Sequence, residues 1–242
     1  MTQVPIADLP PTLVTDVSPS ELVPTHEQVA HYAGGSRYVL EEKHYALVDQ
    51  VIELAQEICR SSVAHALHPV QAWNQQEGLL VLKSGAMLKM PVSLVSSSPQ
   101  FLSVVVTTLG EKVEQTCQRL RREGDLLRST FLDAAGLAML ELLATSALDI
   151  ISSVAQGCGL FIGRRMSPGC YFGLDISLQE TIFRLVDGAA IGVHLKASMV
   201  MSPLKSQSFL VDLTSERIPR LNESKCLFCP NHDCLYRHME AI

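Results

Sequence analysis

An α+β fold, in which long helices pack on a mixed or antiparallel sheet, is what the sequence predicts. Apolar residues recur at helical spacing between positions 41 and 67, a second apolar stretch runs from 134 to 154, and a β-branched run occupies 101–107. The 242 residues are 47% hydrophobic, which is enough to fill a substantial core. We expect these segments to form one domain over residues 25–215.

The first half of the chain predicts an extended arm, one long helix and the start of a sheet. Residues 1–24 favour an extended N-terminal arm over a helix, because they include Pro5, Pro10, Pro11, Pro19 and Pro24. Charged residues between regularly spaced apolar ones predict one amphipathic helix over 41–67. Strands are predicted at 66–73, 78–83 and 101–107.

The second half predicts two consecutive helices before a loop and a hairpin. Glu141 and Asp149 interrupt the apolar stretch 134–154, which favours a buried core helix over a membrane span. Gly124 marks the break between the two helices. The predicted order is helices at 111–123 and 125–156, a strand at 160–162 leading into a loop that holds Arg165, a helix at 178–186, and a terminal hairpin of 196–201 with 207–213.

Charge and motifs exclude several classes of function. The net charge is −6 with acidic and basic residues interspersed, which argues against a nucleic-acid-binding surface. The sequence has no Gly-x-Ser-x-Gly elbow, P-loop or Gly-x-Gly-x-x-Gly motif, which excludes the usual hydrolases, nucleotidases and dinucleotide-binding enzymes. Residues 1–24 lack the basic and apolar regions of a signal peptide, so we expect a cytoplasmic protein that binds no membrane.

The most informative residues are Arg-Met-Ser-Pro-Gly-Cys-Tyr at 165–171. Arg165 supplies a fixed planar cation, and Gly169 has no Cβ and so lets a ligand approach the backbone closely. This combination suits a ligand that carries a carboxylate. From these residues alone, a structural ion pair at Arg165 and a turn at Gly169 are the simpler interpretation.

Two later segments continue the pattern, Ile-Gly-Val-His-Leu at 191–195 and Met-Ser-Pro-Leu-Lys-Ser-Gln-Ser at 201–208. Across residues 25–213, the order and spacing resemble the activation domain of cobalamin-dependent methionine synthase. In that family an Arg-x-x-x-Gly-Tyr stretch binds S-adenosylmethionine, and Pro203, Ser206 and Ser208 fit its later Pro-x-x-Ser-x-Ser pattern. The resemblance implies an α+β fold and a binding site for S-adenosylmethionine formed by Arg165, Ser167, Pro168, Gly169, Cys170 and Tyr171.

Two positions depart from the family pattern. Cys170 stands where the family has a tyrosine directly after the glycine, and Ala197 replaces the glutamate of a Leu-x-Glu-Ser segment. Tyr171 lies one position later, and neighbouring residues of an extended segment point to opposite sides. Tyr171 can take over the stacking role of the family tyrosine only if the loop shifts register. The alternatives for Cys170 are a packing residue, a metal ligand or a redox thiol.

Residues 216–242 form a predicted metal-binding tail. Cys226 and Cys229 are separated by two residues, which lets two thiolates converge on one ion, and Cys234 follows five positions later. His232 is a candidate fourth ligand, as are His238 and a cysteine elsewhere in the chain. Zinc, an iron–sulfur cluster with one non-cysteine or open position, and unligated thiols or a disulfide formed on purification are the alternatives.

The resemblance implies a stand-alone activator of a corrinoid protein or of cobalamin-dependent methionine synthase. It would bind S-adenosylmethionine and support reductive remethylation of cob(II)alamin in trans, by positioning ligand and partner rather than by a catalytic proton shuttle. The sequence lacks an Asp-x-His-x-x-Gly motif, so cobalamin is expected only on the partner. The alternatives are a corrinoid-protein reductase with an iron–sulfur cluster in the tail, and a non-enzymatic docking or chaperone module that has lost S-adenosylmethionine binding.

Overall fold

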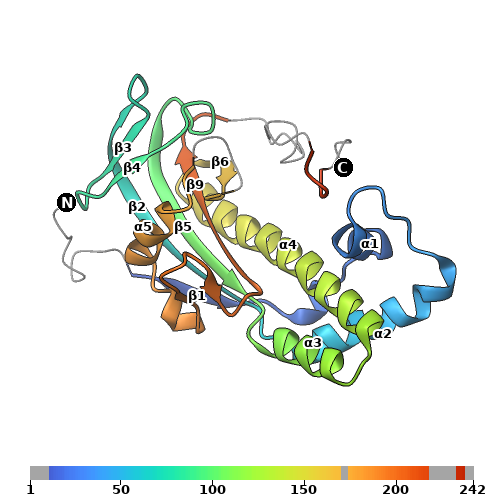
Figure 1. Ribbon diagram of the computed structural model, residues 1–242. Coiled ribbons are helices and arrows are strands. Elements are labelled where there is room, and N and C mark those ends of the chain that lie inside the picture. Colours follow the sequence, from blue (N-terminus) through green and yellow to red (C-terminus); the bar gives the residue numbers. More distant parts are fainter. Residues whose placement is uncertain (1–10, 170–173, 218–232, 238–242) are drawn as a thin grey trace.

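A seven-stranded antiparallel sheet forms the centre of the computed structural model, which describes residues 11–169, 174–217 and 233–237. The strand order is β4-β3-β2-β5-β9-β6, and β1 pairs with residues 62–65 of β2 (Figure 1). Strands β7 and β8 form a separate two-stranded ribbon. The strands are β1 (Leu13–Asp16), β2 (Ser62–Asn74), β3 (Leu79–Leu82), β4 (Met87–Lys89), β5 (Pro99–Thr108), β6 (Phe161–Met166), β7 (His194–Leu195), β8 (Met201–Ser202) and β9 (Ser206–Thr214).

Helices lie on both faces of this sheet, which confirms the predicted α+β class. Helix α4 crosses one face and contacts β5, β6 and β9, while α1, α2 and α3 all pack against α4 (Figure 1). Helix α5 contributes to the core on the opposite face. The helices are α1 (His26–Gly34), α2 (Tyr45–Ile58), α3 (Lys112–Arg122), α4 (Leu126–Gly157) and α5 (Leu178–Leu185), with short 3-10 turns at Pro19–Glu21, Glu42–His44 and Gly188–Ile191.

The central strands are buried on both faces, and this explains their sequence. Successive side chains of a strand point to opposite faces, so β5 and β9 each supply both cores. Because residues 102–108 of β5 are buried on both faces, they form a mostly β-branched run rather than an alternating pattern. Val105, Phe209 and Val211 face the helical layer, whereas Val104, Val106 and Leu210 face the core that includes α5, and all six are fully buried.

Helix α4 is a core helix, as its interrupted apolar sequence predicts. It starts at the N-cap Asp125, whose side chain accepts a hydrogen bond from the backbone N–H of Arg128 at 3.2 Å. Within the described ranges it is the one helix long and apolar enough to cross a membrane. Its side chains Leu132, Met139 and Leu143 instead have no exposed surface and pack in the helical layer.

Two predicted elements are wrong, and tertiary pairing explains both. The helix predicted over 41–67 ends at Ile58, because residues 62–67 pair with β5 and, in part, with β1. The predicted terminal hairpin does not form between 196–201 and 207–213. Residues 207–213 belong to β9, which lies between β5 and β6, while β8 pairs with β7.

The described part of the C-terminal tail lies beside the end of α1. The backbone N–H of Ser36 donates to the carbonyl oxygen of Leu235 at 2.9 Å. The ring of Tyr236 lies 5.8 Å from that of His31, centroid to centroid. Gly35 has a φ of +87°, and a Cβ there would lie 2.6 Å from the Leu235 Cγ, so this contact requires glycine.

The expected domain limits at residues 24 and 215 stay predictions.

Candidate functional site

Arg165 lies in strand β6 rather than in the predicted loop. The strand continues from Phe161 to Met166 because it pairs with β9, where Arg165 stands opposite Val211. A register shift between Ile162 and Arg165 accompanies this pairing. The Arg165 side chain extends along the helix-facing side of the sheet and is 13% exposed. Its Cζ lies 4.9 Å from the centre of the Phe209 ring, so a cation–π contact holds it there.

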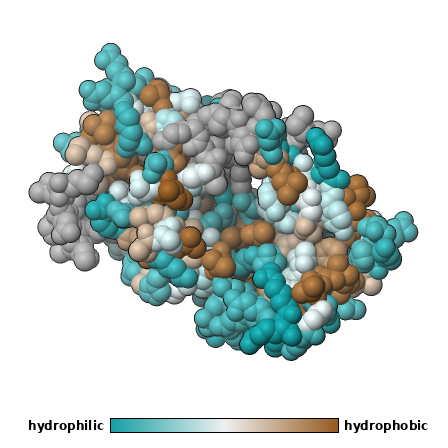
Figure 2. All heavy atoms as spheres, viewed as in Figure 1, coloured by the Kyte–Doolittle hydropathy of each residue, from teal (hydrophilic) through white to brown (hydrophobic). Residues whose placement is uncertain are grey.

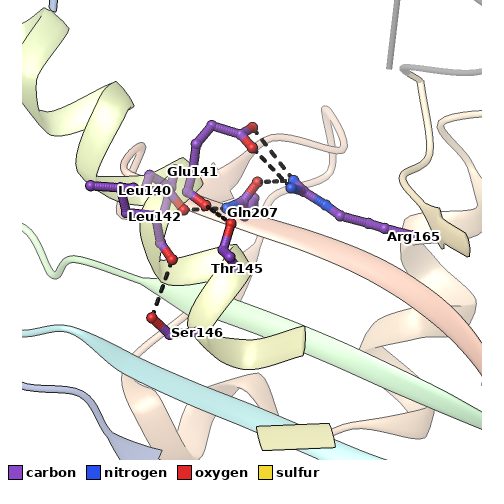
Figure 3. Close-up of polar contacts among 7 residues, drawn as sticks. All are labelled: Leu140, Glu141, Leu142, Thr145, Ser146, Arg165 and Gln207. Atoms are coloured by element: carbon purple, nitrogen blue, oxygen red, sulfur yellow. Dashed lines mark hydrogen bonds and ion pairs between the residues drawn. The ribbon is translucent and has the colours of Figure 1, made fainter. Parts of the chain in front are cut away.

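Two side chains bind the Arg165 guanidinium (Figure 3). Nη1 donates to Oε2 of Glu141 at 2.9 Å, and Nη2 donates to Oε1 of Gln207 at 2.5 Å and, at 3.5 Å, to the second Glu141 oxygen. Gln207 comes from β9, and its Nε2 also donates to the backbone oxygen of Leu140 at 2.6 Å. We call Arg165, Glu141 and Gln207 the arginine cluster. It joins the edge of the sheet to α4.

The arginine cluster is only partly shielded from solvent, and one of its hydrogen-bonding groups is unused. Glu141 sits at the middle of α4 with 33% of its side chain exposed. The buried Nε of Arg165 has no partner among the residues described. The nearby hydroxyl of Thr145 donates to the Glu141 carbonyl oxygen within the helix (Figure 3). The cluster thus contains one cation, one partly exposed carboxylate and one buried N–H without a partner among the residues described.

The surface is hollowed where α4 crosses between the sheet and α1 (Figure 2). Helix α4, which carries Glu141, crosses this part of the view in Figure 1. Concave sites bury more of a small molecule than flat surfaces do. The arginine cluster, whose Glu141 is partly exposed on α4, is the candidate ligand site.

The predicted ligand segment after Arg165 is described only in part. Ser167 is 8% exposed and Pro168 is buried. Gly169 has a φ of +77°, and its backbone N–H donates to the Leu174 carbonyl oxygen at 2.9 Å, so it is a turn residue. Cys170 and Tyr171 lie outside the described residues. Of the six predicted binding residues, Arg165 alone is placed in the arginine cluster.

The later motif divides between the two faces of the sheet. Ser206 hydrogen bonds to Thr108 at 2.8 Å, and Ser208 donates to the Gln179 side-chain oxygen at 2.8 Å. Both serines are buried and face away from the arginine cluster, since side chains alternate along β9. They hold neighbouring elements together on the opposite face from Gln207.

The metal-binding prediction falls mostly outside the described residues, because Cys226, Cys229 and His232 are not among them. Cys234 is described and is partly exposed, with a free thiol. Over residues 11–169, 174–217 and 233–237, no three His, Cys, Asp or Glu side chains lie close enough together to hold a metal ion. A metal site in the tail stays a prediction from cysteine spacing.

Other buried ionisable groups lie in the packed interior, away from the arginine cluster. His65 and His68 are 1% and 0% exposed, and burial lowers the pKa of both, so they are neutral packing residues. The Nε2 of His68 hydrogen bonds to the Leu185 carbonyl oxygen at 2.9 Å. Burial raises the pKa of Asp212, although its Oδ2 accepts a hydrogen bond from the Ser96 backbone N–H at 3.0 Å.

Comparison with known proteins gives a structural match without a sequence match. No protein-family model and no curated protein matches the chain. A crystal structure of the MetH reactivation domain bound to AdoHcy superimposes with a TM-score of 0.62, at 12% sequence identity, over 88% of this chain and 83% of that one. The chain has the fold of that reactivation domain. At this identity the likeness shows the fold alone.

Sequence reasoning missed two residues of the arginine cluster. Glu141 was noticed only as a charge that interrupts an apolar stretch, yet a lone carboxylate between Leu140 and Leu142 requires a buried or partly buried partner. That signal points to Glu141, but it does not identify Arg165 as the partner of Glu141. Gln207 carried no signal of its own, because an isolated glutamine is common on exposed strands.

Proposed function

We propose that this chain is a counterpart of the reactivation domain, that it binds S-adenosylmethionine beside Arg165, and that it acts on a separate corrinoid protein or cobalamin-dependent methionine synthase. It would support reductive remethylation of cob(II)alamin that the partner carries. The observation that carries this proposal is the arginine cluster, with its partly exposed Glu141, in a fold shared with a domain solved with AdoHcy. The proposed location is the cytoplasm.

The arginine cluster fits the amino-acid end of S-adenosylmethionine. That end is a zwitterion, with a carboxylate and an ammonium on one carbon. Arg165 offers the planar cation that pairs with a carboxylate, and Glu141 offers the anion that pairs with an ammonium. The charges of Arg165 and Glu141 balance each other. A bound zwitterion would pair its carboxylate with Arg165 and its ammonium with Glu141, so no unpaired charge would remain in this partly buried site.

The chain's residues would bind and orient rather than transfer protons. When bound, S-adenosylmethionine supplies the methyl group that the corrinoid accepts. Arg165, held over Phe209, would fix the direction of the ligand's carboxylate end. Ser167, Pro168, Cys170 and Tyr171 belong to the same proposed segment. No residue is assigned a catalytic role.

Titration calorimetry with S-adenosylmethionine and with AdoHcy tests the proposal. Wild-type protein should bind saturably, and Arg165→Ala should abolish binding, because the carboxylate loses its partner. Arg121→Ala is a matched control, since Arg121 is an exposed arginine of α3 and should leave binding unchanged. Absence of binding by the wild-type protein would refute the proposal.

One observation favours a second function, in which the chain does not bind S-adenosylmethionine. Arg165 is already paired with Glu141 and Gln207, which is also what a purely structural arginine requires. In that case the chain would be a docking or chaperone module for a corrinoid protein. Saturable binding of a corrinoid protein by a chain that does not bind S-adenosylmethionine would support this function.

The tail adds a redox alternative. Cys226, Cys229 and Cys234, with His232, would hold zinc or an iron–sulfur cluster, and a cluster would deliver the electron to the partner's cobalt. Leu235, next to Cys234, accepts a hydrogen bond from the backbone N–H of Ser36, just beyond the end of α1. Iron, sulfide and zinc analysis of anaerobically purified protein separates the metals. Cobalt reduction without S-adenosylmethionine would identify a corrinoid reductase.

A further inference from the structure

Gln207 bonds both to Arg165 and to the helix that carries Glu141. Its side-chain oxygen accepts from Nη2 of Arg165 at 2.5 Å, and its side-chain nitrogen donates to the backbone oxygen of Leu140 at 2.6 Å. Leu140 directly precedes Glu141 on α4 (Figure 3). A single neutral side chain thus connects the cation of the site to the helix residue next to its carboxylate.

Strand β9 holds α4 at a second point on the same face. Lys205, two residues before Gln207, pairs with Asp133 of α4 at 2.9 Å, and its side chain is 7% exposed. Gly136 makes room for it, because a Cβ there would lie 3.2 Å from the Lys205 Cε. With Lys205 and Gln207 both bound to α4, the helix is fixed along the sheet, and so is the position of Glu141 relative to Arg165.

The neutrality of Gln207 matters as much as its position. Both ends of its amide are used, so it holds Arg165 without cancelling the guanidinium charge. A carboxylate at this position would compete with a ligand's carboxylate for Arg165 and would also face the Leu140 carbonyl oxygen. The amide leaves Arg165 and Glu141 as a balanced pair.

We propose that Gln207 is a positioning residue that keeps Arg165 in place when a ligand displaces Glu141, and that it makes the site select a ligand with a carboxylate. This inference rests on the proposed function, because it takes S-adenosylmethionine as the ligand. Three groups hold the Arg165 guanidinium: the Phe209 ring, the Glu141 carboxylate and the Gln207 side-chain oxygen. A zwitterion that takes the place of Glu141 at Arg165 can leave the hydrogen bond from Arg165 to Gln207 intact.

The test compares Gln207→Met, Gln207→Glu and Ser208→Ala. Calorimetry gives the affinity for S-adenosylmethionine and for its decarboxylated analogue. Gln207→Met should weaken S-adenosylmethionine binding about tenfold, the loss of one hydrogen bond to a charged group. Gln207→Glu should weaken it further while leaving binding of the decarboxylated analogue within about twofold of wild type. Ser208→Ala removes a buried hydrogen bond on the opposite face, so it should lower Tm but not affinity.

A ligand-free readout keeps the two proposals separable. The Arg165 Nε–H signal in NMR spectra should be sharp in wild-type protein and broadened or lost in Gln207→Met, because the guanidinium gains freedom. If wild-type protein binds no S-adenosylmethionine, the proposed function and the ligand selection both fail, and the Nε–H signal decides whether Gln207 positions Arg165. Unchanged affinity and an unchanged Nε–H signal in Gln207→Met would overturn the inference.

Discussion

Replacing Gly163, the one glycine within the strands that the structure describes, with alanine should strongly destabilise the protein. Gly163 lies in β6 at the register shift before Arg165. A Cβ at this position would lie 2.1 Å from Oδ1 and 2.7 Å from Cγ of Asp212. Asp212 has no exposed surface, and turning its carboxylate away would break its hydrogen bond to the Ser96 backbone N–H.

The expected cost is about 3 kcal/mol, at the upper end of overpacking in a closed core. For a chain of this size that corresponds to a fall in Tm of roughly 6–12 °C, measured by differential scanning calorimetry. Gly157→Ala is the matched control, since a Cβ at the exposed end of α4 meets nothing within 4 Å. The control should change stability by less than about 1 kcal/mol, in the stabilising direction.

A second variant identifies the cause of the loss. Asp212→Ser shortens the side chain that the new Cβ would strike, so Gly163→Ala should cost less than about 1 kcal/mol in that background. A Tm for Gly163→Ala within about 2 °C of wild type would refute the reasoning. So would an equal cost in both backgrounds, because the clash with Asp212 would then not be its source.

Three further outcomes follow from single contacts. Because burial raises the pKa of Asp212, its contribution to stability is full below its unfolded pKa of about 4 and is lost as pH rises through the higher folded pKa. Asp212→Asn should flatten this decline in Tm, measured as pH is raised above about 4. Gly35→Ala should release the tail segment from α1 and speed amide exchange at Ser36 about tenfold, without a global loss of stability; unchanged exchange would contradict it. Burial raises the pKa of Cys117 to about 11, so at about pH 8 iodoacetamide should label the exposed Cys158 and spare Cys117, as read by mass spectrometry.

Elements set by local pattern could be predicted from the sequence. The break at Gly124 and the amphipathic spacing on either side placed α3 and α4 to within two residues. The β-branched run at 101–107 placed β5, whose two buried faces need such residues. Helix α1 was missed, although its capping box was readable: Thr25 and Gln28 each bond the other's backbone N–H, at 3.2 and 2.9 Å.

Features set by distant pairing could not be predicted in the same way. Residues 62–67 have an apolar pattern that suits a helix or a strand, and pairing with β5 decides between them. Arg165 was identified as a site residue, but its partners are 24 and 42 positions away in sequence. No local pattern connects Glu141 with Gln207, because α4 brings one and β9 the other.

The position of β9 has a consequence for how this protein is made. The strand lies between β5 and β6, and it is the last of the sheet to leave the ribosome. About 100 residues separate the end of β5 from the end of β9, so at about 5–20 residues per second one edge of β5 stays open for roughly 5–20 s. During that time β6 has no strand to pair with, and the apolar face of α4 has only part of its sheet. Folding of the nascent chain therefore waits for residues 206–214, and a premature stop before them would leave an exposed strand edge that invites aggregation.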